Sequence, residues 1–209
     1  MATVHVRVGH RLWRAGAMLT LCAAVMIVAS CSVRSTQEMT PLPSPSAPKE
    51  GSIMFTMSSP AFEAGGLIPP EYANRGYPGG ENVSIPYDWT GAPAGTVSYA
   101  LLLIDRHPVA HSWVHWLVTS IAPDATSLAR GASGAAMPPG AREHLNTSGR
   151  VGYSGPQPPA GTGKHEYEAV LYALDTRTNL PEDLPLNDFM RAIDGHVLAT
   201  ATYSGLFGR

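Results

Sequence analysis

The stretch that decides the fold is Val97-Ser-Tyr-Ala-Leu-Leu-Leu-Ile104, which is followed directly by Asp105. Gly95 stands before this nearly continuous apolar run, and a turn at Pro108 follows it. Such a run between turn residues is typical of a buried central strand. The sequence therefore predicts a central strand over residues 97–104, with a carboxylate at its end.

Further strands are expected on either side of this run, because several other segments are apolar or alternating and are bounded by glycine or proline. These segments are residues 52–59, 83–89, 113–121 and 167–174. One late helix is expected, with a cap at Asn187 or Asp188 and an apolar face that comprises Phe189, Ile193, Val197 and Leu198. Many strands, long connections and a single helix predict a mainly β fold of antiparallel sheets, as a sandwich or an open barrel.

The first 30 residues have the features of an export signal. Arg7, Arg11 and Arg14 form a basic start, and a short apolar run follows. The run ends in Val28-Ala-Ser-Cys31, which resembles the lipobox of bacterial lipoproteins, in which the cysteine is lipidated. The alternative is a plain signal peptide or an anchor helix that happens to contain a cysteine. The interpretation as a lipoprotein predicts a lipid anchor at Cys31 and a position on the extracytoplasmic face of a bacterial cell membrane.

The remaining chain is expected to contain a tether and one domain. Residues 31–51 are rich in Ser, Thr and Pro without apolar periodicity, which predicts a flexible tether. Residues 52–209 are enough for one domain with a real core. Cys22 lies inside the export signal, so the domain has no cysteine pair, and we expect neither disulfides nor cysteine-bound metal.

The charge of the chain argues against a nucleic-acid partner. The whole sequence has a formal net charge of −2, with 14 Lys and Arg against 16 Asp and Glu, and its domain has no basic cluster. Proteins that bind nucleic acids need such a cluster to neutralise phosphates.

Asp105, His115 and His165 carry most of the functional information. Each is a polar residue set into, or at the end of, an apolar segment that is expected to be a strand. Taken singly, a histidine or aspartate at a strand end is most simply a packing or edge residue. Their joint occurrence beside glycine- and proline-rich stretches predicts that distant strands bring them to one small pocket.

Several blocks of sequence resemble the phosphatidylethanolamine-binding protein family, in its bacterial Raf-kinase-inhibitor-like branch. These blocks occur in family order and cover nearly the whole domain. They are Ser59-Pro-Ala-Phe-Glu-Ala-Gly-Gly-Leu-Ile-Pro69, Asn82-Val-Ser84, Trp89-Thr-Gly-Ala-Pro-Ala-Gly-Thr96, Asp105, Trp113-Val-His-Trp116, Gly152-Tyr-Ser-Gly-Pro156, His165-Glu-Tyr167, Leu171-Tyr-Ala-Leu-Asp175 and Ala192-Ile-Asp-Gly-His-Val-Leu-Ala199.

The resemblance implies a Greek-key fold of antiparallel sheets with a shallow, preformed anion site. The family's site residues carry over onto Asp105, Trp113, His115, Gly155, Pro156, His165 and Tyr167. We therefore expect non-catalytic binding of a small anion, a phosphate ester or a phospholipid head group, without a cofactor. A protein partner and a homodimer are both left open.

The chemistry of these residue types is consistent with an anion site. Imidazoles donate hydrogen bonds in either protonation state, so His115 and His165 are the expected main donors. Asp105 can fix a histidine tautomer, and Tyr167 adds a hydroxyl. Gly155 is expected to let backbone N–H groups approach a ligand, and Trp113 to form an apolar wall.

The sequence departs from the family pattern near the expected pocket. The family usually has Asp-Pro-Asp-Ala-Pro where this chain has Asp105-Arg-His-Pro-Val-Ala110, and Glu166 stands in place of an arginine. The change creates His107, His111 and His115 at spacings of four. On a helix this spacing would suit a metal, but Pro108 and the alternation that follows it argue against a helix. The preferred interpretation is a polar, exposed loop without metal.

Two other classes of function remain as alternatives. A small esterase or phosphatase would use the Asp105 and histidine pocket for acid–base chemistry, but the sequence has no nucleophile elbow and no phosphate-cradling loop. A kinase- or protease-inhibitor-like interaction protein is the third class, since eukaryotic members of the family act in that way. The expectation is that the chain is not an enzyme.

Overall fold

The computed structural model describes residues 54–209, and the expected export signal (1–30), Cys31 and the tether (31–51) lie outside them. The strands are β1 (Thr56–Ser58), β2 (Tyr87–Thr90), β3 (Ser98–Asp105), β4 (Val114–Ile121), β5 (Ser127–Leu128), β6 (Arg142–Glu143), β7 (Lys164–Leu174) and β8 (Val197–Gly208). One α-helix, α1 (Leu186–Ile193), and two 3-10 turns, η1 (Pro70–Tyr72) and η2 (Pro108–Ala110), complete these elements. Within this part of the chain, no helix is long and apolar enough to cross a membrane.

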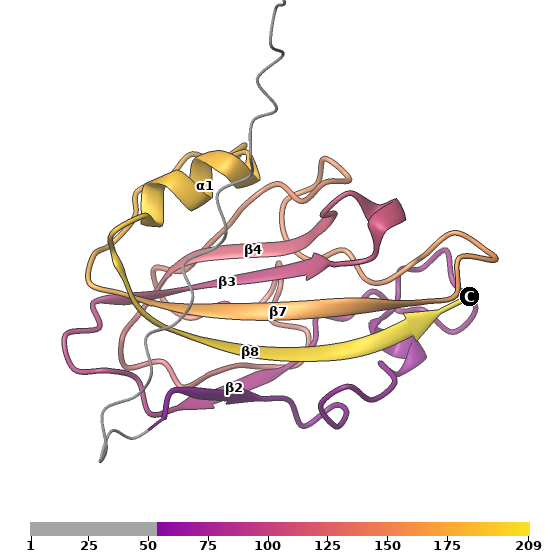
Figure 1. Cartoon of the computed structure of the whole chain (residues 1–209), viewed down its shortest axis with the longest axis horizontal. Coiled ribbons are helices and arrows are strands. Elements are labelled where there is room, and N and C mark those ends of the chain that lie inside the picture. The colour runs from indigo at the N-terminus through magenta and orange to yellow at the C-terminus, as the bar shows by residue number, and fades with distance from the viewer. Residues whose placement is uncertain (1–53) are drawn as a thin grey trace, which may run out of the picture. The chain divides into compact units, whose positions relative to one another are not determined.

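The strands form two antiparallel sheets, as the sequence predicts. The larger has the order β6-β4-β3-β7-β8, and the smaller has the order β1-β2-β5. Figure 1 shows the long strands β4, β3, β7 and β8 side by side, although β3 and β7 are far apart in the sequence. The central strand β3 lies between β4 and β7, and all eight of its residues are buried.

Two apolar cores on opposite faces of the large sheet explain why β3 is apolar from Tyr99 to Ile104. Leu101 and Leu103 belong to the core that also contains Trp89 of the small sheet. Leu102 belongs to a second core, which includes Phe189 of α1. Side chains alternate between the faces of a strand, so a strand that is covered on both sides is apolar at successive positions. Full burial of one leucine side chain contributes roughly 1.5–3 kcal/mol to the stability of the fold. Because β3 buries several leucines, it contributes strongly to the core on both faces of the sheet.

The expected cap and end of the helix are wrong, and the sequence does not predict the strands β5, β6 and β8. The helix starts after Pro185, which acts as the N-cap, so neither Asn187 nor Asp188 caps it. It stops at Ile193 because Gly195 adopts a left-handed conformation with φ of 76°. Residues 197 and 198, expected on the helix face, instead begin β8, which pairs with β7 along nearly its whole length.

Candidate functional site

A pocket of about 360 Å³ lies where β3 ends and β7 begins. Six of the seven residues expected at the site line it, namely Asp105, Trp113, His115, Gly155, His165 and Tyr167. Pro156 does not line it, and its carbonyl instead accepts a hydrogen bond from the Asn74 N–H at 3.0 Å. The lining residues that the sequence analysis did not identify are Asn74, Val109, Ala110, Ser148, Ser154, Gln157, Pro158 and Pro159.

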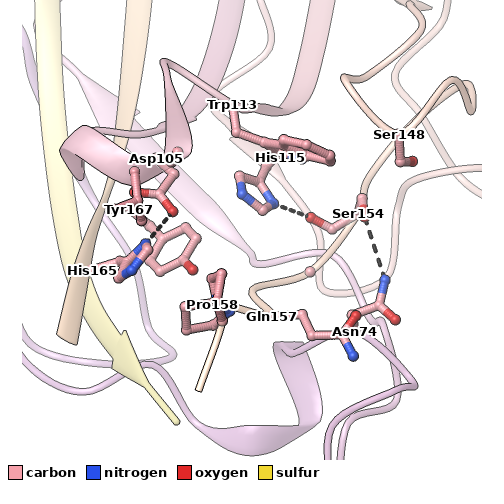
Figure 2. Close-up of a pocket in the computed structure, with 14 residues that line it drawn as sticks. Asn74, Asp105, Trp113, His115, Ser148, Ser154, Gln157, Pro158, His165 and Tyr167 are labelled. Carbon is pink, nitrogen blue, oxygen red and sulfur yellow. Dashed lines mark hydrogen bonds and ion pairs between the residues drawn. The ribbon is translucent and has the colours of Figure 1, made fainter. Parts of the chain in front are cut away.

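Strand pairing places one wall of the pocket. Asp105 is the last residue of β3, and its cross-strand partner on β7 is Tyr167. His165 lies two residues before Tyr167, so both side chains point to the same face of the sheet. Figure 2 shows Asp105, His165 and Tyr167 on one side of the pocket, with His115 and Ser154 opposite them.

A β-bulge places the other wall. Leu103 pairs with Trp116 and Ile104 pairs with Val114, so His115 is an extra residue on β4. Bulges of this kind redirect a side chain and recur beside functional sites. The bulge explains how His115 faces the pocket although its neighbour Trp116 belongs to the core between the sheets.

Asp105 and His165 form a buried pair. The Oδ2 atom of Asp105 lies 2.6 Å from Nδ1 of His165, and Oδ1 accepts the N–H of His107 at 2.8 Å. Nε2 of His165 lies 2.8 Å from Oγ1 of Thr162, whose hydroxyl donates to the carbonyl of Pro159 at 2.7 Å. A hydroxyl has one hydrogen, so this network assigns a hydrogen to both ring nitrogens of His165. The ring is thus an imidazolium beside a carboxylate, and both of its N–H groups are used inside the protein.

His115 has the opposite character. Its Nδ1 atom lies 2.6 Å from the carbonyl oxygen of Ser154, which can only accept, so Nδ1 carries the hydrogen. Burial lowers the pKa of His115 to about 4, although the charge of Asp105 opposes this shift. The ring is therefore neutral near pH 7, and Nε2, which has no partner among the described residues, presents a lone pair. The expectation that His115 and His165 are the main donors is not supported by this geometry.

The donors that remain for a ligand are neutral groups. Burial raises the pKa of the Tyr167 hydroxyl, and the negative charge of Asp105 raises it further, so the hydroxyl stays protonated. The Ser154 hydroxyl accepts a long hydrogen bond from Asn74 and keeps its own hydrogen, and the Gln157 amide also lines the pocket. Trp113 is 38% exposed and forms part of the rim.

Gly155 is required for packing and not for presenting its N–H to a ligand, which corrects our expectation. Its N–H donates to Oδ1 of Asn82 at 2.8 Å. A Cβ atom at this position would lie 2.2 Å from the carbonyl oxygen of Tyr72 and 2.6 Å from backbone atoms of Ala73 and Asn74. The glycine therefore allows two backbone segments to touch behind the pocket.

The residues that depart from the family pattern are also placed. His107 is not in an exposed loop position as expected, because its ring stacks on that of His165. Arg106 pairs with Glu168 at 2.6 Å, and His111 is exposed. Within residues 54–209, no three His, Cys, Asp or Glu side chains gather as a set of metal ligands.

These features define an antiparallel β domain with a preformed polar pocket at the ends of its central strands. Residues 58–208 match the family model described as "Phosphatidylethanolamine-binding protein". The chain therefore belongs to the phosphatidylethanolamine-binding protein family.

Several known proteins are similar to this chain. A UPF0098 protein of Methanothermobacter thermautotrophicus is 38% identical over 156 residues, which cover 74% of this chain and 99% of that protein. LppC of Mycobacterium tuberculosis, named as a lipoprotein, is 41% identical over 61% of this chain and 59% of its own length.

Two solved structures share the fold. CT736 from Chlamydia trachomatis, described as a homologue of phosphatidylethanolamine-binding protein (PEBP), has a TM-score of 0.66 at 31% identity. The match covers 76% of this chain and 99% of that one. YbcL of Escherichia coli, described as a member of the mammalian PEBP family, has a TM-score of 0.70 at 27% identity, over 74% of this chain and 98% of that one.

Proposed function

We propose that this domain binds a small anion, a phosphate ester or a phospholipid head group, and that it does not transform the ligand. The observation that carries the proposal is the preformed pocket itself, where neutral donors surround a closed carboxylate–imidazolium pair. Asp105 is the one acidic residue among the lining residues, and its two oxygens are occupied by His165 and by the His107 N–H. An incoming anion thus meets donors and not an unpaired negative charge.

The experiment that tests this proposal is an NMR titration of the domain with inorganic phosphate and with phosphoethanolamine. Binding in the pocket is expected to shift the imidazole signals of His115 and His165 at millimolar ligand. Tyr167→Phe, which removes a pocket donor, is expected to weaken binding severalfold. Tyr172→Phe is the matched control, because its side chain lies on the same strand but in the other core. Unchanged histidine signals at millimolar ligand would contradict the proposal.

A hydrolase is the second candidate, and one observation bears on it. Thr162, His165 and Asp105 form a hydrogen-bonded chain with the order of a catalytic triad. The hydroxyl hydrogen of Thr162 is donated to the Pro159 carbonyl, and the histidine nitrogen that faces the hydroxyl carries its own hydrogen. This nitrogen cannot act as the general base that a nucleophile needs. A panel of carboxylic and phosphoric esters, with Thr162→Val as control, tests this alternative: turnover that the variant abolishes would establish it.

We further propose that a lipid on Cys31 anchors the domain to the extracytoplasmic face of a bacterial membrane. Among the first 31 residues, a basic segment is followed by an apolar run and then by small residues before the cysteine, which supports the anchor. The similarity to LppC, which is named as a lipoprotein, supports it as well. Cys31→Ser is expected to abolish labelling by a palmitate analogue and partition into detergent, while Cys22→Ser leaves both unchanged. Persistent labelling of the Cys31 variant would contradict the anchor.

A further inference from the structure

We infer that the pocket takes its anion together with a proton, so that it selects phosphate monoesters in their singly charged form over phosphodiesters. This inference rests on the proposed anion-binding function and specifies the ligand. It follows from the hydrogen-bond directions in the pocket, which can be assigned atom by atom.

The acceptor at the centre of the argument is Nε2 of His115. Because Nδ1 donates to the Ser154 carbonyl at 2.6 Å, the neutral ring has its lone pair on Nε2. In the described part of the chain, two side-chain atoms are both fully buried and without a hydrogen-bond partner, Trp89 Nε1 and Thr178 Oγ1. Nε2 of His115 also has no partner but is not among these fully buried atoms, so it is accessible from the cavity. An oxygen of a fully ionised phosphate would meet this lone pair without a hydrogen between them. A P–OH group supplies that hydrogen.

The groups around His115 keep its ring neutral in the protein without a ligand. The other titratable residues that line the pocket are Asp105 at the end of β3 and His165 and Tyr167 on β7. The negative charge of Asp105 favours protonation of His115, whereas the charge of His165 opposes it, and burial is larger than either effect. His107 stacks on the ring of His165, and the segment from Ser154 to Pro159 contributes no charged side chain. The second pKa of a phosphate monoester, about 6, lies above that of His115, so the proton in the complex belongs to the ligand.

The donor set agrees with a singly charged ligand. The lining groups that can donate are the hydroxyls of Tyr167 and Ser154 and the amide side chains of Asn74 and Gln157, all neutral. A dianion would need more positive charge than one imidazolium that is already paired with a carboxylate. A phosphate monoester, with a second pKa of about 6, is partly singly charged near neutral pH. The phosphodiester in the head group of phosphatidylethanolamine has no P–OH hydrogen to offer to Nε2, and its ammonium group is shared by the monoester phosphoethanolamine.

Isothermal titration calorimetry with two soluble ligands tests the inference. Phosphoethanolamine is the monoester and glycerophosphoethanolamine is the diester. Monoester affinity is expected to fall about 20-fold from pH 5.5 to pH 7.5, because the singly charged form is depleted over that range. At pH 7.5, titrations in buffers of different ionisation enthalpy should show uptake of about one proton per ligand. The diester should bind at least tenfold more weakly than the monoester at pH 5.5.

Three outcomes are separable. Equal affinity for the two ligands, or monoester affinity that is independent of pH, would overturn the inference while leaving the proposed function in place. Binding of neither ligand at either pH would overturn both. Weaker diester binding together with proton uptake would support both.

A pair of variants localises the effect. His115→Asn keeps an N–H near the position of Nδ1 but removes the Nε2 acceptor, so proton uptake and the preference for the monoester should disappear. His111→Asn replaces an exposed histidine of the neighbouring loop and should leave both unchanged. If His115→Asn does not fold, as circular dichroism would show, the pH and diester experiments on the wild-type protein still decide the question.

Vesicle flotation then identifies the source of the monoester. Phosphatidic acid presents a monoester head group, and phosphatidylethanolamine presents a diester, each in a phosphatidylcholine background. Binding to phosphatidic acid alone would support selection of a lipid monoester, whereas a soluble monoester bound without flotation would assign the site to free phosphate esters. Preferential binding to phosphatidylethanolamine vesicles would contradict the inference.

Discussion

The imidazole ring of His107 lies flat on that of His165, with ring centroids 3.9 Å apart and 11° between the planes. Asp105 holds the edge of the same His165 ring through Nδ1. The His165 ring is thereby fixed at one face and one edge. The family pattern usually has an acid at the position of His107. The stack places the imidazolium of His165 against the face of a second aromatic ring, an arrangement similar to a cation–π interaction.

Replacement of His107 by asparagine should destabilise the domain through loss of this stack. Asparagine can still accept the backbone N–H of Val109, as Nδ1 of His107 does at 3.4 Å, so the start of η2 is retained. The free energy of unfolding is expected to fall by about 0.5–1.5 kcal/mol in urea titrations. His111→Asn is the control and should change it by less than about 0.5 kcal/mol. Equal effects of the two variants would mean that the stack contributes nothing.

Gly155→Ala should destabilise the domain far more than Gly161→Ala. The added Cβ at residue 155 meets backbone atoms of three residues, which cannot move aside as a flexible side chain can. We expect a loss of about 3 kcal/mol or more, or no folded protein. Gly161 has φ of 82° but open space around its Cβ position, so its replacement should cost only about 1 kcal/mol. Thermal or urea unfolding measures both, and comparable losses would refute the steric explanation.

His115 should make stability depend on pH in the acid range. Its folded-state pKa of about 4 lies below the ordinary histidine pKa of 6.5, so the unfolded state binds more protons between these values. The stability that neutral His115 contributes is complete above pH 6.5 and is lost as the pH falls towards 4. The difference in unfolding free energy between wild type and His115→Asn should therefore narrow by on the order of 3 kcal/mol from pH 7 to pH 4. A difference that is constant with pH would contradict the lowered pKa.

Glu143 should matter for stability because it collects three hydrogen bonds. Its carboxylate accepts from Nε1 of Trp116 at 2.7 Å, from the Ser133 hydroxyl at 2.5 Å and from the Gly134 N–H at 2.8 Å. Glu143→Gln replaces an acceptor with a donor and should lower the free energy of unfolding by about 1–2 kcal/mol in urea. Glu166→Gln, on the exposed side of β7, should change it by less than about 0.5 kcal/mol. If both variants are equally stable, the carboxylate does not hold this region together.

The centre of the fold could be predicted from the sequence because burial on both faces leaves an unmistakable pattern. Residues 97–104 are apolar except for Ser98, and the strand is found at Ser98–Asp105. The last strand could not be predicted in the same way. Val197 and Leu198 continue a helical spacing from Phe189, and only the left-handed turn at Gly195 separates them from the helix. Period alone does not show where a chain reverses.

The composition of the pocket was largely predictable, but its hydrogen-bond directions were not. Asp105, His165 and Tyr167 follow from strand ends and alternation, and the resemblance to the family placed them together. The orientation of His115 depends on a bulge, which adds one residue to a strand without a distinct sequence signal. Its tautomer depends on the Ser154 carbonyl, and backbone carbonyls carry no signature in a sequence. Donor and acceptor roles therefore depend on the three-dimensional structure of the pocket.

The pairing of β3 with β7 also has a consequence for how the chain acquires its native state. Asp105 and His165 are sixty residues apart in the sequence, so the intervening segment must be closed into a loop before they can meet. Contacts of such high sequence separation slow the folding of β proteins. Ligand-binding competence should consequently emerge late during refolding from denaturant, after most of the tryptophan fluorescence change is complete.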